Sequence, residues 1–273
     1  MTRSQLKKTM LALLLSTACA GFIVACGSDQ PATPQGKVVK GPVFGAKVFD
    51  SSNPPVLVGT TDANGNFPLT GIAPYSTTGG AYYPVLANGT ISIVAAVAPS
   101  LKGYNTNPQI TPLTTVIANT ASPTIQATII AQLTGNGISL DTDLSSKTAA
   151  NALAYDLSEA VGAAIQAASN SSAVPATQAA NVSGVLSAVA NALSAPGFVI
   201  TTTNESTIAS SISTQINNAL AAAVVAGTLP ATVSTSAQAA VIAVAAGAAN
   251  LVPGTPSTPT GATGSTGSNG LGF

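Results

Sequence analysis

The 273-residue chain contains no histidine and no tryptophan, only two cysteines, and only 6% charged residues. An ordinary soluble domain has about 25% charged residues, so ionic groups are scarce in this chain. Without histidine the chain cannot form a Ser-His-Asp triad or a histidine-ligated metal site, and two cysteines cannot form a four-cysteine zinc site. Eight Lys and Arg balance eight Asp and Glu, which leaves no basic face for nucleic-acid phosphates. We therefore expect no cofactor, no metal and no nucleic-acid partner.

The N-terminal residues contain the clearest signal in the sequence. Three basic residues fall within the first eight positions, and an apolar run follows over residues 10–24. The run is short and is interrupted by Ser, Thr and Gly, which is typical of a secretory signal peptide and not of a membrane span. We predict a signal peptide over residues 1–25.

Cys26 follows this run, within the sequence IVACGS of residues 23–28. The segment resembles the lipobox of bacterial lipoproteins, in which small residues precede a cysteine that is acylated and becomes the mature N-terminus. The resemblance implies lipidation of Cys26. By the same resemblance, Gly27 after that cysteine, in place of Asp, permits sorting to the bacterial outer membrane, and we expect an anchor there on the cell-surface or periplasmic face. Two alternatives stay open: an ordinary cleaved signal without lipid, and acylation of Cys19, whose upstream residues fit the motif less well.

Acylation determines how such a protein would meet a membrane. Each buried methylene contributes about 0.8 kcal/mol, and two acyl chains hold a protein stably on a bilayer. Once the signal peptide is removed, Cys26 is the only cysteine left, so we expect no intrachain disulfide. Residues 26–36 are rich in Pro, Gly and polar side chains and are predicted to be a tether.

Residues 37–109 show the pattern of a small antiparallel Greek-key β-sandwich. Short apolar runs alternate with turn signals, as in sandwiches built from many short strands. The segment DANGN of residues 62–66 contains an Asn-Gly step, which is typical of hairpin turns. A second Asn-Gly step at Asn88-Gly89 precedes a predicted strand over Ile91–Val97.

Two motifs in this region are similar to those of the carboxypeptidase regulatory-like family. GKVVKGPVFGAKV (residues 36–48) corresponds to a first hairpin of that family, and TDANGNF (residues 61–67) to a later one. The resemblance implies a transthyretin-like β-sandwich with a non-catalytic adhesive, spacer or carbohydrate-associated role. ITPLTTVI (residues 110–117) also resembles the step from such a domain into helices in bacterial surface lipoproteins.

From residue 110 to residue 252 the apolar residues recur about every 3.6 positions, which predicts an α-helical bundle. Helices are expected over residues 123–135 and 142–169, from residue 175, from residue 204, and over residues 234–251. The predicted fold class is therefore α+β with two domains, a sandwich followed by a bundle. Residues 253–273 are rich in Gly, Ser, Thr and Pro and are predicted to be a disordered tail.

The polar faces of these helices are unusual because they contain Ser, Thr, Asn and Gln in place of Glu and Lys. From residue 160 onward the sequence has one charged residue, Glu205. A compositional bias of secreted proteins explains this simply. The alternative is that the uncharged faces pack against another copy, a polymer or a lipid surface.

Few side chains offer candidate chemistry. Asp62, Asn64 and Asn66 have the oxygen spacing of a calcium loop, but Ala73 stands where that loop needs glutamate, so a hairpin turn is the simpler interpretation. Asp156 and Glu159 are three residues apart and are predicted to lie on one solvated helix face, since catalytic carboxylate pairs flank a cleft.

Three further charged residues lie near the start of the second predicted helix. Asp141 and Asp143 are interpreted as helix-capping residues. Lys147 lacks the Ser-x-x-Lys spacing of Ser-Lys enzymes, because Leu144 stands three residues before it.

Four tyrosines in or near the predicted sandwich are candidates for ligand contact. They either stack on sugars or anchor a partner, or they close the edges of a small core. They are Tyr75, Tyr82, Tyr83 and Tyr104.

Together these patterns predict a membrane-anchored bacterial envelope lipoprotein, not an enzyme, with a structural role or a protein- or polysaccharide-binding role. One alternative is a self-assembling extracellular or envelope subunit, a homo-oligomer that uses the uncharged helical faces. A more remote alternative is a carboxylate-dependent hydrolase that brings Asp62 and Asp156 together from different segments.

Overall fold

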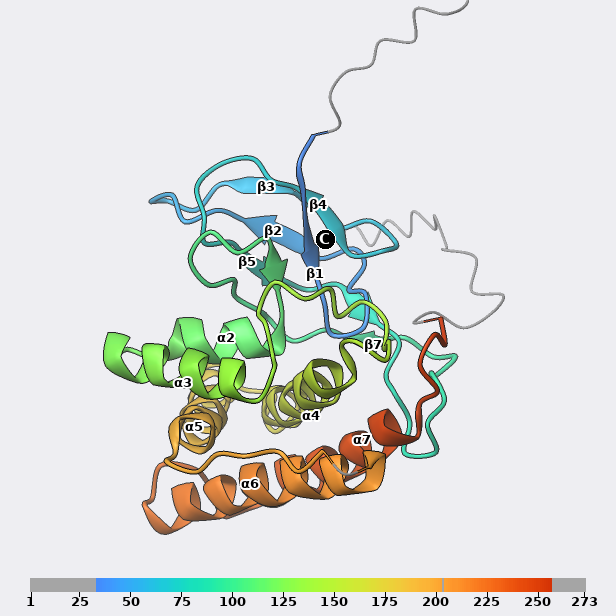
Figure 1. The fold of residues 1–273 in the computed structure, drawn as a ribbon. Coiled ribbons are helices and arrows are strands. Elements are labelled where there is room, and N and C mark those ends of the chain that lie inside the picture. The colour runs from blue at the N-terminus through green and yellow to red at the C-terminus, as the bar shows by residue number, and fades with distance from the viewer. Residues whose placement is uncertain (1–32, 203, 257–273) are drawn as a thin grey trace, which may run out of the picture. The chain divides into compact units, whose positions relative to one another are not determined.

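A computed structural model describes residues 33–202 and 204–256 of the chain. This part of the chain has an α+β fold, in which eight short strands are followed by six helices (Figure 1). The strands are β1 Gln35–Val38, β2 Lys47–Phe49, β3 Leu57–Thr60, β4 Asn66–Pro68, β5 Ser76–Thr78, β6 Ala81–Tyr82, β7 Ala96–Val97 and β8 Gln109–Ile110. The helices are α2 Pro112–Asn119, α3 Pro123–Gly135, α4 Ala152–Ser169, α5 Pro175–Ser194, α6 Glu205–Val225 and α7 Ala231–Asn250. The predicted signal peptide, Cys26 and residues 257–273 of the predicted tail lie outside the described residues.

The strands form three small sheets. Their strand orders are β4-β1-β8, β3-β2-β5 and β6-β7. All pairs are antiparallel except β1 and β8, which run parallel. The expectation of a purely antiparallel arrangement is therefore wrong at this pair, because β8 enters from the long connection before the helices and not from a hairpin.

The turn at Asp62–Asn66 forms as predicted, but it does not close a hairpin. It joins β3 to β4, and these strands belong to different sheets. Gly65 has a φ of 79°, a left-handed conformation that glycine adopts without strain. A side chain at Gly65 would also collide with the Val38 carbonyl group. The Asn-Gly step thus makes a tight corner from one sheet to the other.

The second Asn-Gly step does make a hairpin. Val85 and Ile91 pair across the turn at Asn88-Gly89, and this hairpin lies against α7, since a side chain at Gly247 would collide with the Leu86 carbonyl group. The strand predicted over Ile91–Val97 is mostly wrong, because only β7 at its end is a strand. Ile93 is 84% exposed, so the apolar run there has no sheet to pack into.

Helix starts follow the sequence signals closely. The Ser122 side chain caps α3 by accepting a hydrogen bond from the Ile125 backbone N–H, and Asn204 forms a capping box with Thr207 at the start of α6. These side chains satisfy backbone donors that the first helical turn leaves unpaired. Pro175 opens α5 as predicted.

The start predicted for the second helix, near Thr142, is wrong. The helix there is α4, which begins at Ala152, and Thr142 and Asp143 lie in the preceding loop. Short-range polar contacts compete with the helix in this segment. The Asp143 carboxylate accepts a hydrogen bond from the Ser145 backbone N–H, and the Asn151 amide donates to the Asp143 and Ser146 carbonyl oxygens.

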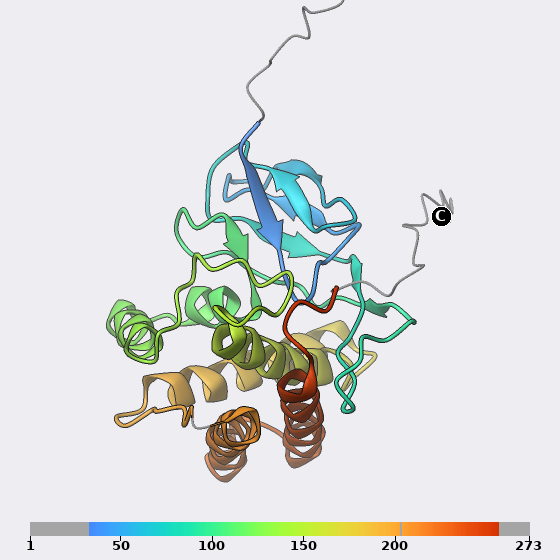
Figure 2. The same cartoon turned by 45° about the vertical axis from the view of Figure 1, so that its right-hand side comes forward.

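The helices share one large apolar core. Helix α4 lies between the sheets and the α6–α7 pair, and α7 packs against both α4 and α6 (Figures 1 and 2). On α7 the apolar residues Val241, Ala245 and Ala248 are buried, whereas Ile242 is 54% exposed. Among the described residues, α7 is the one helix long and apolar enough to cross a membrane by length and composition alone.

A separate, smaller core fills the sheet half. It consists of ten buried apolar residues, with the Phe67 and Tyr75 rings packed edge to face at 5.3 Å. The two halves are joined by hydrogen bonds where β8 leads into α2. The Thr115 hydroxyl accepts from the Lys102 backbone N–H, and the Thr114 hydroxyl donates to the Lys102 carbonyl oxygen.

Candidate functional site

The carboxylates predicted to lie on a solvated face of α4 are buried, so that prediction is wrong. Asp156 is 0% exposed and Glu159 is 3% exposed. Two lysines are buried with them, Lys147 at 0% and Lys40 at 2%. Buried charges are costly unless they are paired and hydrogen-bonded, and each of these four has polar partners.

Lys147, Asp156 and Glu205 form one group, which we call the Lys147 cluster. The Lys147 Nζ atom lies 3.1 Å from Asp156 Oδ1 and 2.9 Å from Glu205 Oε2. It also donates hydrogen bonds to Asp156 Oδ2 at 3.2 Å and to the Ala248 carbonyl oxygen at 2.7 Å. One ammonium group therefore contacts two carboxylates and a backbone carbonyl.

Four segments bring the Lys147 cluster together. Lys147 lies in the loop before α4, Asp156 in the first half of α4, and Glu205 is the first residue of α6. The carbonyl acceptor, Ala248, belongs to the last turn of α7, where the negative end of the helix dipole favours a cation. The Lys147 carbonyl oxygen in turn accepts from the Gly254 backbone N–H at 2.8 Å. The cluster thus connects α4, α6, α7 and the residues after α7.

Burial sets the ionisation of this cluster. Burial, opposed by the Lys147 charge and reinforced by the Glu205 carboxylate, raises the pKa of Asp156 to about 7. Desolvation disfavours the charged form of a carboxyl group, which is why the pKa rises even beside a lysine. Asp156 therefore holds a proton far more readily than an exposed aspartate.

Lys40 and Glu159 form a second buried group, at the turn that follows β1. The Lys40 Nζ donates to the Tyr82 hydroxyl at 2.9 Å, and Glu159 Oε1 accepts from the Gly41 backbone N–H at 3.0 Å. Burial raises the pKa of Glu159, against the opposing effects of the Lys40 charge and the Gly41 hydrogen bond. These contacts attach the turn after β1 to the middle of α4.

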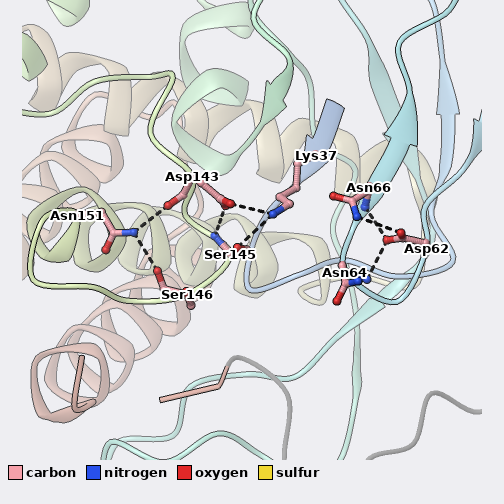
Figure 3. Close-up of polar contacts among 8 residues, drawn as sticks. All are labelled: Lys37, Asp62, Asn64, Asn66, Asp143, Ser145, Ser146 and Asn151. Atoms are coloured by element: carbon pink, nitrogen blue, oxygen red, sulfur yellow. Dashed lines mark hydrogen bonds and ion pairs between the residues drawn. The ribbon is translucent and has the colours of Figure 1, made fainter. Parts of the chain in front are cut away.

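Asp62 and Asp143 lie near the surface, where each accepts hydrogen bonds from neighbouring side chains or backbone groups (Figure 3). Asp143 forms an ion pair with Lys37 at 2.8 Å. Asp62 accepts hydrogen bonds from the backbone N–H groups of Asn64 and Asn66, both at 2.8 Å. These bonds hold the corner between β3 and β4, in agreement with the interpretation of this motif as a turn.

Asp141 lies outside the Lys147 cluster and outside the Lys40–Glu159 group. Asp141 accepts a hydrogen bond from the Asn107 side chain at 2.8 Å. It therefore fixes a loop contact and does not cap a helix. Among the described residues, no three Cys, Asp or Glu side chains gather in a group that could hold a metal ion.

The four candidate tyrosines occupy different environments. Tyr75 and Tyr82 are buried, Tyr83 is half-buried beside Phe44 with ring centroids 5.6 Å apart, and Tyr104 is half-buried. Tyr104 lines an open groove of about 730 Å³ between the loop before β8 and α3. The groove also contains Asn105, Asn107, Ser139 and Asp141, so it combines an aromatic ring with amide, hydroxyl and carboxylate groups.

The two acids considered for hydrolysis are not brought together. Asp62 is held in its turn by the asparagines, whereas Asp156 contacts Lys147 in the helical core. The Lys147 cluster itself was not foreseen as a unit. The sequence does contain a sign of this cluster. Glu205 is the one charged residue after Glu159, and a lone charge in an apolar helical bundle needs a partner of opposite charge.

Comparisons with known proteins give no match: no family model, no curated protein and no solved structure is significantly similar to this chain.

Proposed function

We propose that this protein is a bacterial envelope lipoprotein, anchored by a lipid at Cys26, with a structural or binding role and no catalysis. The observation that supports the anchor is the sequence IVACGS at residues 23–28, which follows a basic head and an apolar run. Such a segment is typical of secreted chains, and acyl chains on the cysteine supply stable membrane attachment. Gly27 after the cysteine supports our proposal that the anchor lies in the outer membrane, on its cell-surface or periplasmic face.

The groove lined by Tyr104 supports a binding role. Sugars present hydroxyl groups and apolar ring faces together, and an aromatic ring next to amide and carboxylate groups matches both. The groove residues Asn105, Asn107 and Asp141 supply those polar groups. We therefore propose a polysaccharide as the favoured partner, with a protein partner as the alternative.

We also propose that residues 37–109 form a Greek-key β-sandwich domain of the transthyretin-like type. The support is that each family motif contains a glycine in a tight turn, Gly41 and Gly65, with φ angles of 58° and 79°, although the strands flanking each motif lie in different sheets and do not form the expected hairpins. Only glycine adopts such angles without cost. The parallel β1–β8 pair departs from the antiparallel form of that fold.

The anchor is tested by replacing each cysteine in turn. Cys26→Ala is expected to abolish incorporation of a fatty-acid label and to move the protein from the membrane fraction to the soluble fraction. Cys19→Ala is the matched control and is expected to leave both unchanged. If Cys26→Ala still fractionates wholly with membranes, the anchor proposal is wrong.

The binding role is tested on the soluble chain without its signal peptide and anchor. A glycan array and isolated envelope polysaccharides are the probes. Tyr104→Ala is expected to weaken any binding about fivefold, because stacking on an aromatic ring contributes about 1 kcal/mol. Tyr83→Ala is the control, since Tyr83 lies outside the groove. Equal binding by the Tyr104 variant would place the binding surface elsewhere.

A second candidate function, self-assembly, is favoured by the outer face of the α6–α7 pair. A groove of about 440 Å³ runs between these helices and contains no charged residue. Ile242 in this groove is 54% exposed. Light scattering during size-exclusion chromatography tests this candidate. Dimers or larger species that dissociate in Ile242→Lys would support it, and a monomer at high concentration would exclude it.

A further inference from the structure

The Lys147 cluster contains the groups that an amide bond between two side chains requires. Lys147 supplies an amine and Asp156 a carboxyl group, and both side chains are 0% exposed. The Nζ atom lies within 3.2 Å of both carboxyl oxygens, so the carbon between them is also close. Reacting atoms held about 3–3.5 Å apart in a fixed orientation react far faster than the same groups in solution.

We propose that Lys147 and Asp156 become joined by an intramolecular isopeptide bond, with Glu205 transferring the proton. The proposal concerns a covalent modification of the folded chain and is independent of the proposed lipid anchor and binding role.

The ionisation of the cluster suits this reaction. Amide formation requires a neutral amine and a protonated carboxyl group, whereas an ordinary ion pair in water holds both groups in their charged forms. Burial raises the pKa of Asp156 to about 7. Moving the shared proton from the ammonium to the carboxylate removes two buried charges, which a low-dielectric site favours. A buried site therefore favours the neutral amine and the protonated carboxyl group, which are the forms that react, more than a surface site does.

The reaction balances without any added reagent. The proton moves from the Lys147 ammonium to the Asp156 carboxylate, and rotation of the carboxyl group presents its face to the Nζ lone pair. Nζ then forms a bond to Cγ. Glu205 Oε2, which lies 2.9 Å from Nζ, takes a proton from the nitrogen and returns it to the departing hydroxyl group. The C–O bond breaks, one water molecule leaves, and a neutral amide remains.

Two features of the site favour completion. The two Asp156 oxygens differ in their contacts: Lys147 donates a hydrogen bond to Oδ2, while Oδ1 lies 3.1 Å from Nζ and accepts no hydrogen bond from the described residues. Oδ1 is therefore the oxygen better able to leave. Glu205 is 45% exposed, which gives the released water a route to solvent. The product replaces the buried Lys147 and Asp156 charges with one neutral amide, and it fixes the loop before α4 in a chain for which no disulfide is expected.

The test uses the purified full chain, denatured and digested after storage in its folded state. In a linked chain, trypsin does not cleave after Lys147, and the spanning peptide is lighter by the mass of one water molecule. Chymotrypsin cleavage after Leu153 or Tyr155 then yields two fragments that stay joined. A succinimide at Asp156 also loses water but leaves Lys147 cleavable. Complete cleavage after Lys147 and an unmodified mass would overturn the proposal.

The chain contains its own control. Lys37 and Asp143 lie 2.8 Å apart but are partly exposed, and trypsin is expected to cleave after Lys37 in the same digest. Glu205→Gln keeps the size and polarity of the side chain but cannot transfer the proton, so the link is expected to disappear while circular dichroism shows a folded protein. Linking in Glu205→Gln as complete as in the wild type would exclude that role for Glu205.

Discussion

Two lysine–aspartate pairs in this protein have similar distances between their charged atoms, but the pKa values of their aspartates shift in opposite directions. Lys37 and Asp143 lie 2.8 Å apart with side-chain exposures of 21% and 53%, while Lys147 and Asp156 lie 3.1 Å apart with both side chains at 0%. Burial raises the pKa of Asp143 less than the Lys37 and Ser145 hydrogen bonds lower it, so the net shift is downward. For Asp156 the effect of burial outweighs that of the Lys147 charge, so the pKa of this carboxyl group shifts upward. The burial of each pair, and not the distance between its charged atoms, decides whether the pKa of the aspartate rises or falls.

The same contrast applies to stability. An exposed pair contributes about 0–1 kcal/mol, because water screens the charges and the side chains lose freedom. Removing one partner of a buried pair costs about 3–5 kcal/mol, because the other charge is left in the core without compensation. The Lys147 cluster is therefore expected to matter to folding, and the Lys37 pair is expected to matter little.

Asp156→Ala should produce the largest effect. Without the Asp156 carboxyl group neither the ion pair nor the proposed amide can form, and the buried Lys147 ammonium keeps only the Glu205 carboxylate and the Ala248 carbonyl as partners. The expected loss is about 3–5 kcal/mol in the free energy of unfolding measured with urea. A loss below about 1 kcal/mol would mean that the cluster behaves like a surface pair.

Glu159→Gln should change how stability depends on pH. Burial raises the folded-state pKa of Glu159 above its ordinary value of 4.5, so the folded state holds this proton more tightly than the unfolded chain. The stabilisation is complete below the ordinary pKa and is lost as the pH rises through the folded-state pKa.

Melting temperatures of wild type and Glu159→Gln from about pH 4 to pH 8 measure this effect, since the difference between the two profiles isolates Glu159. The advantage of the wild type should shrink as the pH rises. A difference that is constant over the range contradicts the buried position of this carboxyl group.

Asp143→Asn should have the smallest effect and the opposite dependence on pH. The folded-state pKa of Asp143 is lowered from 3.8, so its contribution is present above that pH and is lost as the pH falls through the folded-state pKa. Near neutral pH the expected cost is at most about 1 kcal/mol by urea unfolding, and added salt should reduce it. A cost insensitive to salt would show that this pair is not screened by solvent.

Local signals in the sequence predicted much of the helical half. Caps and prolines fixed the starts of α3, α5 and α6, because Ser122, Pro175 and Asn204 act on their own helix turns. The predicted start of α4 is wrong because Asn151 and Asp143 make polar contacts that hold the residues before Ala152 in a loop.

Features that depend on distant residues could not be predicted. The turn at Gly65 was recognised, but which sheets its strands join depends on the pairing of β1 with both β4 and β8. Asp156 was placed in solvent because its spacing from Glu159 shows nothing of Lys147 or of Glu205, which is 49 residues further along the chain. Which charged residues meet in this core depends on the tertiary fold and cannot be read from their spacing in the sequence.

The proposed envelope role is tested most directly by the mass of the N-terminal peptide of the protein extracted from membranes. We expect a peptide that begins at Cys26 and is heavier by the acyl groups attached to it. An unmodified Cys26 within a longer peptide, or a mature N-terminus at another residue without lipid, would contradict the lipoprotein assignment.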